Sequence, residues 1–473
     1  MSATAVTPAK ESPRPAERTW ADFRLIPRIE TFPRVVAFAQ TVVGKLVLLA
    51  AFGLGLRFFY SFAGVVQLLL PLALITFMPE YRRFVLALAP LCLLLVQPDN
   101  VPLVVGLKLG VVAAGIVLFW CARRWPQSWF GRRPIVFLLS GFSLLIVLAC
   151  AAAPRTLAYR IMWDLVGVTA TYVWFIGYAL MDRSAKPRID TSLELASFRP
   201  LWGSTTTPFP KGAAYLRRIE AQDEQQLAVV QLKGLKLLAW AILLGLLQTS
   251  WTGFFHGYLR IPTSAEALAL SVHGTPAPWH VRWESQILFF FEVTLAVAIT
   301  GHKFIACCRL AGFNALRNTY RPLSSKTIAE FFNRFYYYFK ELLVDFFFYP
   351  TFLRYWKGNK RLRIVFATFA AVVFGNSFFH LTRDWDFIQK YGLWRALVTY
   401  QVLFFYSAVL AAALSISQLR KRARSNEFLR GHVLPILGVL SFYCLLGIFI
   451  DEDRLYPLAV HLRYLAGLFF IRF

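Results

Sequence analysis

Long apolar runs alternate with short polar linkers along most of the chain. A helix needs roughly 20 mostly apolar residues to cross the hydrocarbon core of a bilayer, and most of these runs approach that length. The pattern predicts about twelve transmembrane helices, at 35–57, 61–79, 84–97, 101–121, 135–153, 161–181, 234–251, 285–302, 363–380, 396–416, 432–450 and 456–472. The predicted fold class is therefore an all-α polytopic membrane protein with additional interfacial or re-entrant helices.

The polar linkers divide the chain into four parts. Residues 1–34 form a polar, basic N-terminal tail, and residues 35–181 contain the first group of predicted transmembrane helices. Residues 182–233 form a cytoplasmic loop that ends in an amphipathic helix, which we expect from Arg217 to Gln231. Residues 234–473 contain the remaining helices and the candidate active site.

The composition excludes an ordinary soluble enzyme. Hydrophobic residues make up 58% of the 473 residues and charged residues only 16%, whereas a soluble domain carries about a quarter charged residues. A disordered chain is excluded as well, because disorder requires low hydrophobicity. The 51 Lys and Arg outnumber the 25 Asp and Glu, but they lie in the linkers, so membrane topology explains them better than a nucleic-acid partner does.

The placement of these charges predicts an orientation, because cytoplasmic loops are enriched in Lys and Arg. We place the N-terminus in the cytoplasm and expect a multi-pass protein of the cell (inner) membrane. The basic linkers then lie inside, at 82–83, 123–133, 182–233, 303–362 and 417–431. The linkers that lie outside include 97–99, 252–284 and 451–453.

Several common kinds of site have no signature in the sequence. The six cysteines show no C-x-x-C spacing, and the histidines show no H-x-x-x-H spacing with an acidic partner. We therefore predict neither a disulfide framework nor a metal site. Walker-type and G-x-G-x-x-G phosphate loops are also absent from the sequence.

One polar stretch of the second half has the periodicity of an amphipathic helix. Thr327 and Glu330 have the spacing of a capping box, so a helix should start there. Apolar residues follow at helical spacing, at 328, 331, 332, 335, 339, 342, 343 and 346, and Tyr349-Pro350 should end the helix. The predicted helix 327–349 is too polar to cross lipid alone, so it lies at the cytoplasmic interface or enters the protein as a re-entrant element. The alternative is a surface helix with a solvated charged face.

A histidine closes the predicted membrane helix 363–380. An ionisable side chain at this depth costs free energy unless it has a partner or a wet cavity, so His380 is a candidate functional residue. The alternative is an interfacial histidine that is hydrogen-bonded to its neighbours, helped by Arg383 and Asp384.

The order of features from 301 to 381 resembles the membrane-bound O-acyltransferase (MBOAT) family, in particular its bacterial polymer-acylating branch. The resemblance covers about 80 residues and rests on spacing rather than on any single element. Its residues are Gly301, Leu310 to Phe313, Asn318 to Pro322, Glu330 to Tyr336, Asp345, Pro350 and Phe379-His380-Leu381. The chain departs from the family where Phe379 replaces a tryptophan, Leu381 a glycine, and Tyr336 a histidine or asparagine.

The resemblance implies transfer of an acyl group, in the first place acetyl, from an acyl-CoA or another thioester to a hydroxyl. The acceptor would be an exported polysaccharide, an envelope component or a secreted metabolite, and a periplasmic or extracellular partner acyltransferase could complete the transfer. His380 would be the general base, since an imidazole with a reference pKa of about 6.5 accepts protons at cellular pH. No G-x-S-x-G element is present, which favours direct attack by the acceptor hydroxyl.

Four further residues receive predicted roles. Tyr336 or Asn376 would donate a hydrogen bond to the developing oxyanion. Arg334 and Lys340 would attract the phosphates of the donor from the cytoplasm, or they serve only as positive-inside anchors. By the predicted topology His380 lies toward the outer end of its helix, and the family resemblance implies a tunnel that joins it to the cytoplasmic side.

Two other functions remain open. One is a transporter or membrane scaffold on an MBOAT-like fold, without catalysis. Secondary transporters usually carry polar groups in two related halves, whereas here the polar features are concentrated in one half. The other is acylation of a lipid or sterol acceptor.

Overall fold

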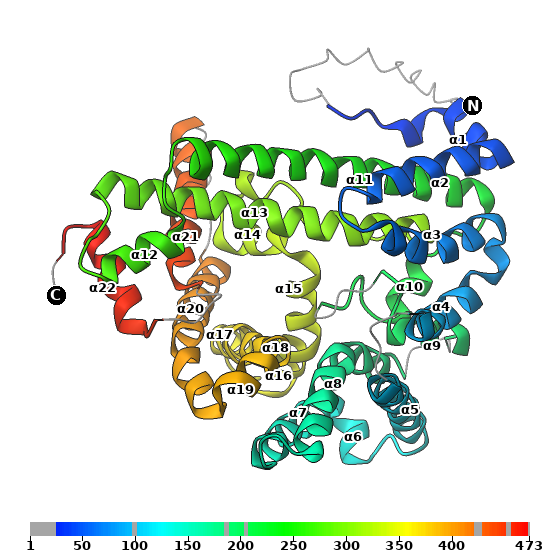
Figure 1. The fold of residues 1–473 in the computed structure, drawn as a ribbon, viewed down its shortest axis with the longest axis horizontal. Coiled ribbons are helices and arrows are strands. Elements are labelled where there is room, and N and C mark those ends of the chain that lie inside the picture. Colours follow the sequence, from blue (N-terminus) through cyan, green and yellow to red (C-terminus); the bar gives the residue numbers. More distant parts are fainter. Residues whose placement is uncertain are drawn as a thin grey trace, which may run out of the picture.

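The computed structural model describes residues 25–96, 102–183, 189–202, 207–420, 428–450 and 456–471. Over these residues the fold is all-helical, and the only extended pairing is an isolated antiparallel bridge between Glu220 and Phe313 (Figure 1). The predicted outer turns at 97–99 and 451–453 lie outside the described residues, as does most of the tail 1–34.

Eight helices of the described chain are long and apolar enough to cross a membrane. They confirm the prediction of a polytopic helical membrane protein. Five of them are single helices: α5 (Pro102–Arg124), α7 (Pro134–Ala151), α8 (Leu157–Asp182), α13 (Trp279–Leu310) and α20 (Leu393–Leu419). The other three are composite: Glu224–Tyr258 (α11 Glu224–Thr252 and η4 Gly253–Tyr258), Lys360–Arg383 (α17 Lys360–Phe369, η7 Ala370–Gly375 and α18 Asn376–Arg383), and Leu429–Phe449 (η8 Leu429–Val433, α21 Leu434–Leu446 and η9 Gly447–Phe449).

The count of about twelve helices is not confirmed, chiefly because the N-terminal runs are bent. Helices α1 (Pro33–Gln40) and α2 (Val42–Leu56) meet at 96°, and α3 (Phe62–Phe77) meets the segment Pro79–Pro90 at 117°. The predicted helices 61–79 and 84–97 (α4, Arg82–Val96) therefore form at most one broken span or a re-entrant loop. The last predicted helix is also short, since α22 spans only Leu458–Leu468.

Local contacts explain the first bend. Thr41 has extended backbone angles and caps α2, its Oγ1 accepting a hydrogen bond from the Gly44 amide at 3.0 Å. A Cβ atom at Gly44 would lie 1.8 Å from the Phe38 carbonyl oxygen, so the turn is too tight for any other residue. The hydropathy of a segment gives its apolar content but not the direction of its helix axis. Neither of the two bends could therefore be predicted from hydropathy.

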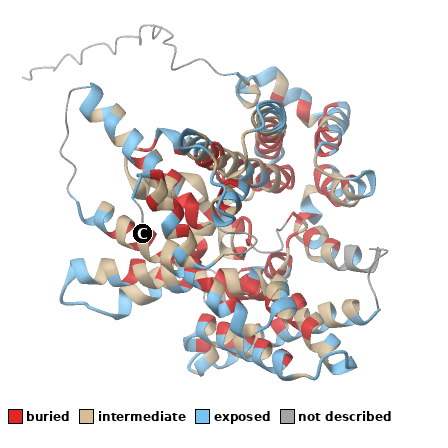
Figure 2. Ribbon diagram, turned by 60° about the vertical axis from the view of Figure 1, so that its left-hand side comes forward, coloured by how far each residue is buried: buried red, intermediate tan, exposed pale blue. Residues whose placement is uncertain are grey.

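The outward faces of the long helices are apolar. Buried residues lie on the inner faces of the helices, and the outer faces are exposed (Figure 2). Large hydrophobic side chains occupy these exposed positions, for example Leu144 and Leu148 of α7 and Leu246 and Leu247 of α11. An exposed apolar surface of this extent is typical of contact with lipid.

The predicted cytoplasmic loop contains two short helices, α9 (Thr191–Phe198) and α10 (Ala213–Ile219). The predicted single helix from Arg217 to Gln231 is wrong. The chain leaves the helix at Glu220, which pairs with Phe313, and α11 starts after Asp223, whose Oδ1 accepts a hydrogen bond from the Gln226 amide at 2.7 Å. The remaining short helices are α6 (Trp129–Arg132), α12 (Ser264–Val272) and α19 (Trp385–Tyr391), with 3-10 turns η2 (Ile29–Thr31), η3 (Pro79–Tyr81) and η5 (Pro322–Ser324).

Linkers that were predicted for one side of the membrane do meet in space. Arg83 pairs with Glu220 at 2.8 Å and with Asp190 at 3.1 Å, so the linker 82–83 contacts the loop 182–233. Arg123 pairs with Glu194 of the same loop at 2.5 Å. These contacts support a common side for the three linkers, while the compartment that they face stays a prediction.

Candidate active site

The predicted helix 327–349 is divided into α14 (Ile328–Phe335), α15 (Tyr337–Leu343), η6 (Val344–Phe348) and α16 (Tyr349–Arg354). Its predicted start is confirmed, because Thr327 Oγ1 accepts a hydrogen bond from the Glu330 amide at 3.1 Å. Its predicted continuity and end are wrong. Tyr336 has non-helical angles (φ −139°, ψ 74°), and Pro350 lies in the first turn of α16, where a helix tolerates proline.

A segment from earlier in the chain satisfies the backbone groups that the break leaves without helical partners. The Tyr337 amide donates to the Asn318 carbonyl oxygen at 2.9 Å, and the Tyr338 amide donates to Asn318 Oδ1 at 3.2 Å. On the other side of the break, Thr319 Oγ1 donates to the Phe335 carbonyl oxygen at 2.8 Å. Residues 318 and 319 therefore hold the turn between α14 and α15 in place.

This arrangement requires a glycine at position 301. A Cβ atom there would lie 2.4 Å from Asn318 Nδ2, so we expect Gly301→Ala to displace Asn318 and to destabilise the protein by about 1–3 kcal/mol. The measurement is thermal unfolding in detergent. Gly438→Ala is the matched control, because nothing lies within 4 Å of its added Cβ atom. An unchanged unfolding temperature for Gly301→Ala would show that a methyl group at position 301 does not displace Asn318.

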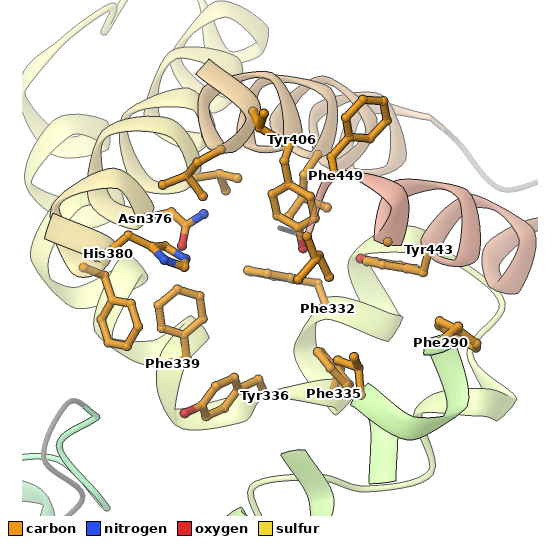
Figure 3. Close-up of a pocket in the computed structure, with 18 of the residues that line it drawn as sticks. Phe290, Phe332, Phe335, Tyr336, Phe339, Asn376, His380, Tyr406, Tyr443 and Phe449 are labelled. Atoms are coloured by element: carbon orange, nitrogen blue, oxygen red, sulfur yellow. The ribbon is translucent and has the colours of Figure 1, made fainter. Parts of the chain in front are cut away.

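The break in the helix borders a cavity of about 220 Å³, which is lined from α13, α14, α15, η7, α18, α20, α21 and η9 (Figure 3). Three residues predicted to be catalytic, Tyr336, Asn376 and His380, all line it. Most of the other lining side chains are aromatic, among them Phe332, Phe339, Phe379, Tyr406, Tyr443 and Phe449. The cavity is therefore a mainly apolar chamber with a few polar groups.

His380 is held by a carboxylate one helical turn further on. It lies on α18, and its imidazole is turned into the cavity (Figure 3). Its Nδ1 atom lies 3.3 Å from Asp384 Oδ2, and Asp384 Oδ1 accepts a hydrogen bond from Arg383 Nε at 2.7 Å. Arg383 also lines the cavity. From the sequence, Arg383 and Asp384 were considered only as partners of an interfacial histidine. The i, i+4 spacing of His380 and Asp384 was the signal that could have indicated their contact.

The two predicted oxyanion donors are engaged with other side chains. Asn376 Nδ2 donates to Ser407 Oγ of α20 at 2.9 Å, and both residues are buried. The Tyr336 hydroxyl shares a hydrogen bond of 2.9 Å with Thr207 Oγ1. Burial raises the pKa of Tyr336 above its ordinary value, so the phenol stays protonated.

We expect Tyr336→Phe to cost about 1 kcal/mol of stability, because the buried Thr207 hydroxyl loses its partner. Activity should fall less than about tenfold, since one hydroxyl bonded elsewhere contributes little to the transition state. Thermal unfolding and the transfer rate are measured on the same preparation. A loss of kcat well beyond tenfold would instead assign the phenol a direct role in the reaction.

Arg334 and Lys340, the residues predicted to attract donor phosphates, do not line the cavity. Arg334 pairs with Glu330 at 2.7 Å and donates to Ser324 Oγ at 3.1 Å. Lys340 pairs with Glu341. Carboxylates of the chain therefore balance both charges, and a role in donor binding stays a prediction.

A partly buried ion cluster that the sequence did not indicate fastens the loop beside Tyr336. Lys211 Nζ lies 2.6 Å from Glu341 Oε2 and 2.7 Å from Asp345 Oδ2, and the Tyr178 hydroxyl donates to Asp345 at 3.2 Å. Burial lowers the pKa of Lys211, but the two carboxylates outweigh burial, and the pKa is raised above its ordinary value. Lys211 is four residues from Thr207, so the cluster fixes the loop that contacts Tyr336.

Comparison of the chain with protein-family models and with curated proteins finds no match. The resemblance to the membrane-bound O-acyltransferases therefore rests on the ordered residues from 301 to 381 alone.

Proposed function

We propose that the chain is a membrane-embedded O-acyltransferase, with His380 as the general base of a transfer from an acyl thioester, such as acyl-CoA, to a hydroxyl group. One observation carries the proposal. Tyr336 and His380, from separate elements of the resemblance, border a single cavity together with Asn376, and the imidazole in it is oriented by Asp384.

The contact with Asp384 supports a definite tautomer. A carboxylate only accepts hydrogen bonds, so the imidazole carries its hydrogen on Nδ1 and has its lone pair on Nε2. Nε2 takes the proton of the acceptor hydroxyl as its oxygen bonds to the thioester carbon. The C–S bond then breaks, and the protonated imidazole returns the proton to the leaving thiolate.

The aromatic lining also favours a second candidate, an O-acyltransferase with a lipid or another lipophilic acceptor. Phe449 lines both the cavity and a neighbouring apolar groove of about 760 Å³ beside α21 and α22. A hydrocarbon chain suits such walls, whereas a polysaccharide would leave its hydroxyls without partners there. A polar acceptor would have to react at the mouth of the cavity.

The test is thiol release and product formation by the purified protein in nanodiscs. Acetyl-CoA and palmitoyl-CoA serve as donors, and a soluble glucan and a long-chain alcohol serve as acceptors. Acceptor-dependent thiol release that is lost in His380→Ala supports an acyltransferase, and the preferred acceptor decides between the two classes. No transfer with any pair, or equal transfer by the variant, contradicts the proposed role of His380.

A further inference from the structure

We propose that Arg383 is a further catalytic residue, whose guanidinium stabilises the oxyanion that forms on the thioester carbonyl. The inference rests on the proposed acyl transfer at His380. It replaces the two oxyanion donors predicted from the sequence, Tyr336 and Asn376, by a cation that the sequence did not place in the site.

The first observation is position. Arg383 lines the same cavity as His380 and lies three residues further along α18. Its side chain is 40% exposed although it lines the cavity, so it marks the mouth. A thioester carbonyl that lies against the imidazole is therefore near the guanidinium as well.

The second observation is a shared carboxylate. Asp384 uses Oδ2 for His380 Nδ1, at 3.3 Å, and Oδ1 for Arg383 Nε, at 2.7 Å. One anion therefore orients both the base and the guanidinium, and keeps them side by side. The base and an oxyanion donor need this proximity, because the attacking oxygen and the carbonyl oxygen are bonded to the same carbon in the tetrahedral intermediate.

The third observation is the chemistry of the remaining lining. The Asn376 amide donates to Ser407, and the Tyr336 hydroxyl pairs with Thr207. Among the described side chains that line the cavity, Arg383 is the one with a permanent charge. A fixed cation beside a chamber with aromatic walls stabilises a developing negative charge, which the apolar side chains of the lining cannot do.

The charge of Arg383 also acts across the cavity. Burial raises the pKa of Tyr336, while the hydrogen bond with Thr207 and the positive charge of Arg383 act in the opposite direction. Tyr336 borders the cavity from the break between α14 and α15, so the two residues line the same cavity from different helices.

The step is balanced without any further reactant. The acceptor oxygen bonds to the carbonyl carbon, its proton moves to His380, and the carbonyl electron pair becomes the oxyanion beside Arg383. The pair then re-forms the carbonyl, the C–S bond breaks, and the proton moves from His380 to the thiolate. The guanidinium donates hydrogen bonds throughout and keeps its protons.

The test compares Arg383→Ala and Arg383→Lys with wild type in the nanodisc assay, with Arg395→Ala as the matched control. Arg395 is exposed near the start of α20 and does not line the cavity. We expect Arg383→Ala to lower kcat about 100-fold with a small change in KM, as for the loss of an oxyanion donor. Arg383→Lys should retain part of the activity, and added guanidinium should partly restore the alanine variant but not His380→Ala.

Three results would overturn this role. They are a wild-type kcat for Arg383→Ala, an effect on KM alone, and a loss that neither lysine nor guanidinium restores. If the alanine variant fails to fold, the ratio of kcat between Arg383→Lys and Arg383→Gln decides, since only lysine keeps the charge; equal values overturn the role. Activity in His380→Ala would instead refute the proposed function itself, so the two failures are distinguishable.

Discussion

His380→Ala is expected to lower kcat by about 1,000-fold or more. A positioned general base contributes typically about 10²–10⁴-fold, and the alanine also leaves Asp384 without the imidazole that it orients. Tyr336 cannot replace the imidazole as the base, because burial raises the pKa of its phenol and the hydroxyl keeps its proton. Acceptor-dependent thiol release in nanodiscs is the measurement.

His432→Ala is the matched control for this substitution. His432 also lies at the end of a membrane helix, but it is exposed, stacks on Phe428 and does not line the cavity. We expect its variant to keep wild-type activity. Equal rates for both variants at equal amounts of folded protein would remove His380 from the reaction and return it to the role of an interfacial histidine.

The sequence predicts those parts of the fold that depend on local composition. Apolar runs locate the long helices because an apolar segment of about 20 residues can cross the membrane as a helix, in which all its backbone hydrogen bonds are satisfied. The start of α14 is equally local, since Thr327 and Glu330 supply its cap within four residues. Bends cannot be predicted in this way. The turn at Thr41 depends on the close approach of Gly44 to the Phe38 carbonyl group. The chain is apolar on both sides of the turn, so hydropathy does not reveal it.

The break at Tyr336 could not be predicted from its own neighbourhood. The apolar spacing continues unbroken from 328 to 346, and the structure departs from a single helix because Asn318 supplies acceptors for the amides of Tyr337 and Tyr338. Long-range partners of this kind override local periodicity. The break matters for the site, because it places Tyr336 on the wall of the cavity.

In the candidate site, too, local signals were predictable from the sequence and long-range contacts were not. His380 was selected from its place at the end of a membrane helix, a local signal. Its neighbours Arg383 and Asp384 were visible in sequence, but their joint orientation toward the cavity depends on the fold. Lys211 gave no signal, because its partners Glu341 and Asp345 are far away along the chain.

Lys211→Met is expected to destabilise the protein by about 1–3 kcal/mol, because Asp345 loses the cation that pairs with it and Glu341 keeps only Lys340. The variant places Glu341 and Asp345 together without their shared cation, and both side chains are less than one-fifth exposed. The loop that holds Thr207 against Tyr336 should loosen, so activity falls with stability. Thermal unfolding and urea unfolding in detergent are the measurements.

The dependence of this effect on pH has a definite sign. Burial raises the pKa of Glu341, but Lys211 and Lys340 outweigh burial and hold it below the ordinary value of 4.5. The stabilisation from Glu341 is therefore complete above about pH 4.5 and is lost as the pH falls through the lowered pKa. The raised pKa of Lys211 keeps the cation charged up to its ordinary value of 10.5 and beyond. Burial outweighs Lys211 at Asp345 and raises the pKa of that carboxyl above its ordinary value. The difference between wild type and Lys211→Met should thus shrink as the pH falls, first through protonation of Asp345 and then through protonation of Glu341.

Lys390→Met is the matched control for Lys211→Met, because Lys390 is exposed on α19 and its ammonium group lies over the ring of Tyr391, 4.9 Å from the centroid. We expect it to change stability by less than about 0.5 kcal/mol. Adding Glu341→Gln and Asp345→Asn to Lys211→Met should recover most of the loss, since neutral amides no longer repel each other and cost less to bury than carboxylates. If the triple variant is no more stable than Lys211→Met alone, the cluster acts through packing of the lysine stem rather than through charge, and the loop beside Tyr336 is held by its apolar contacts.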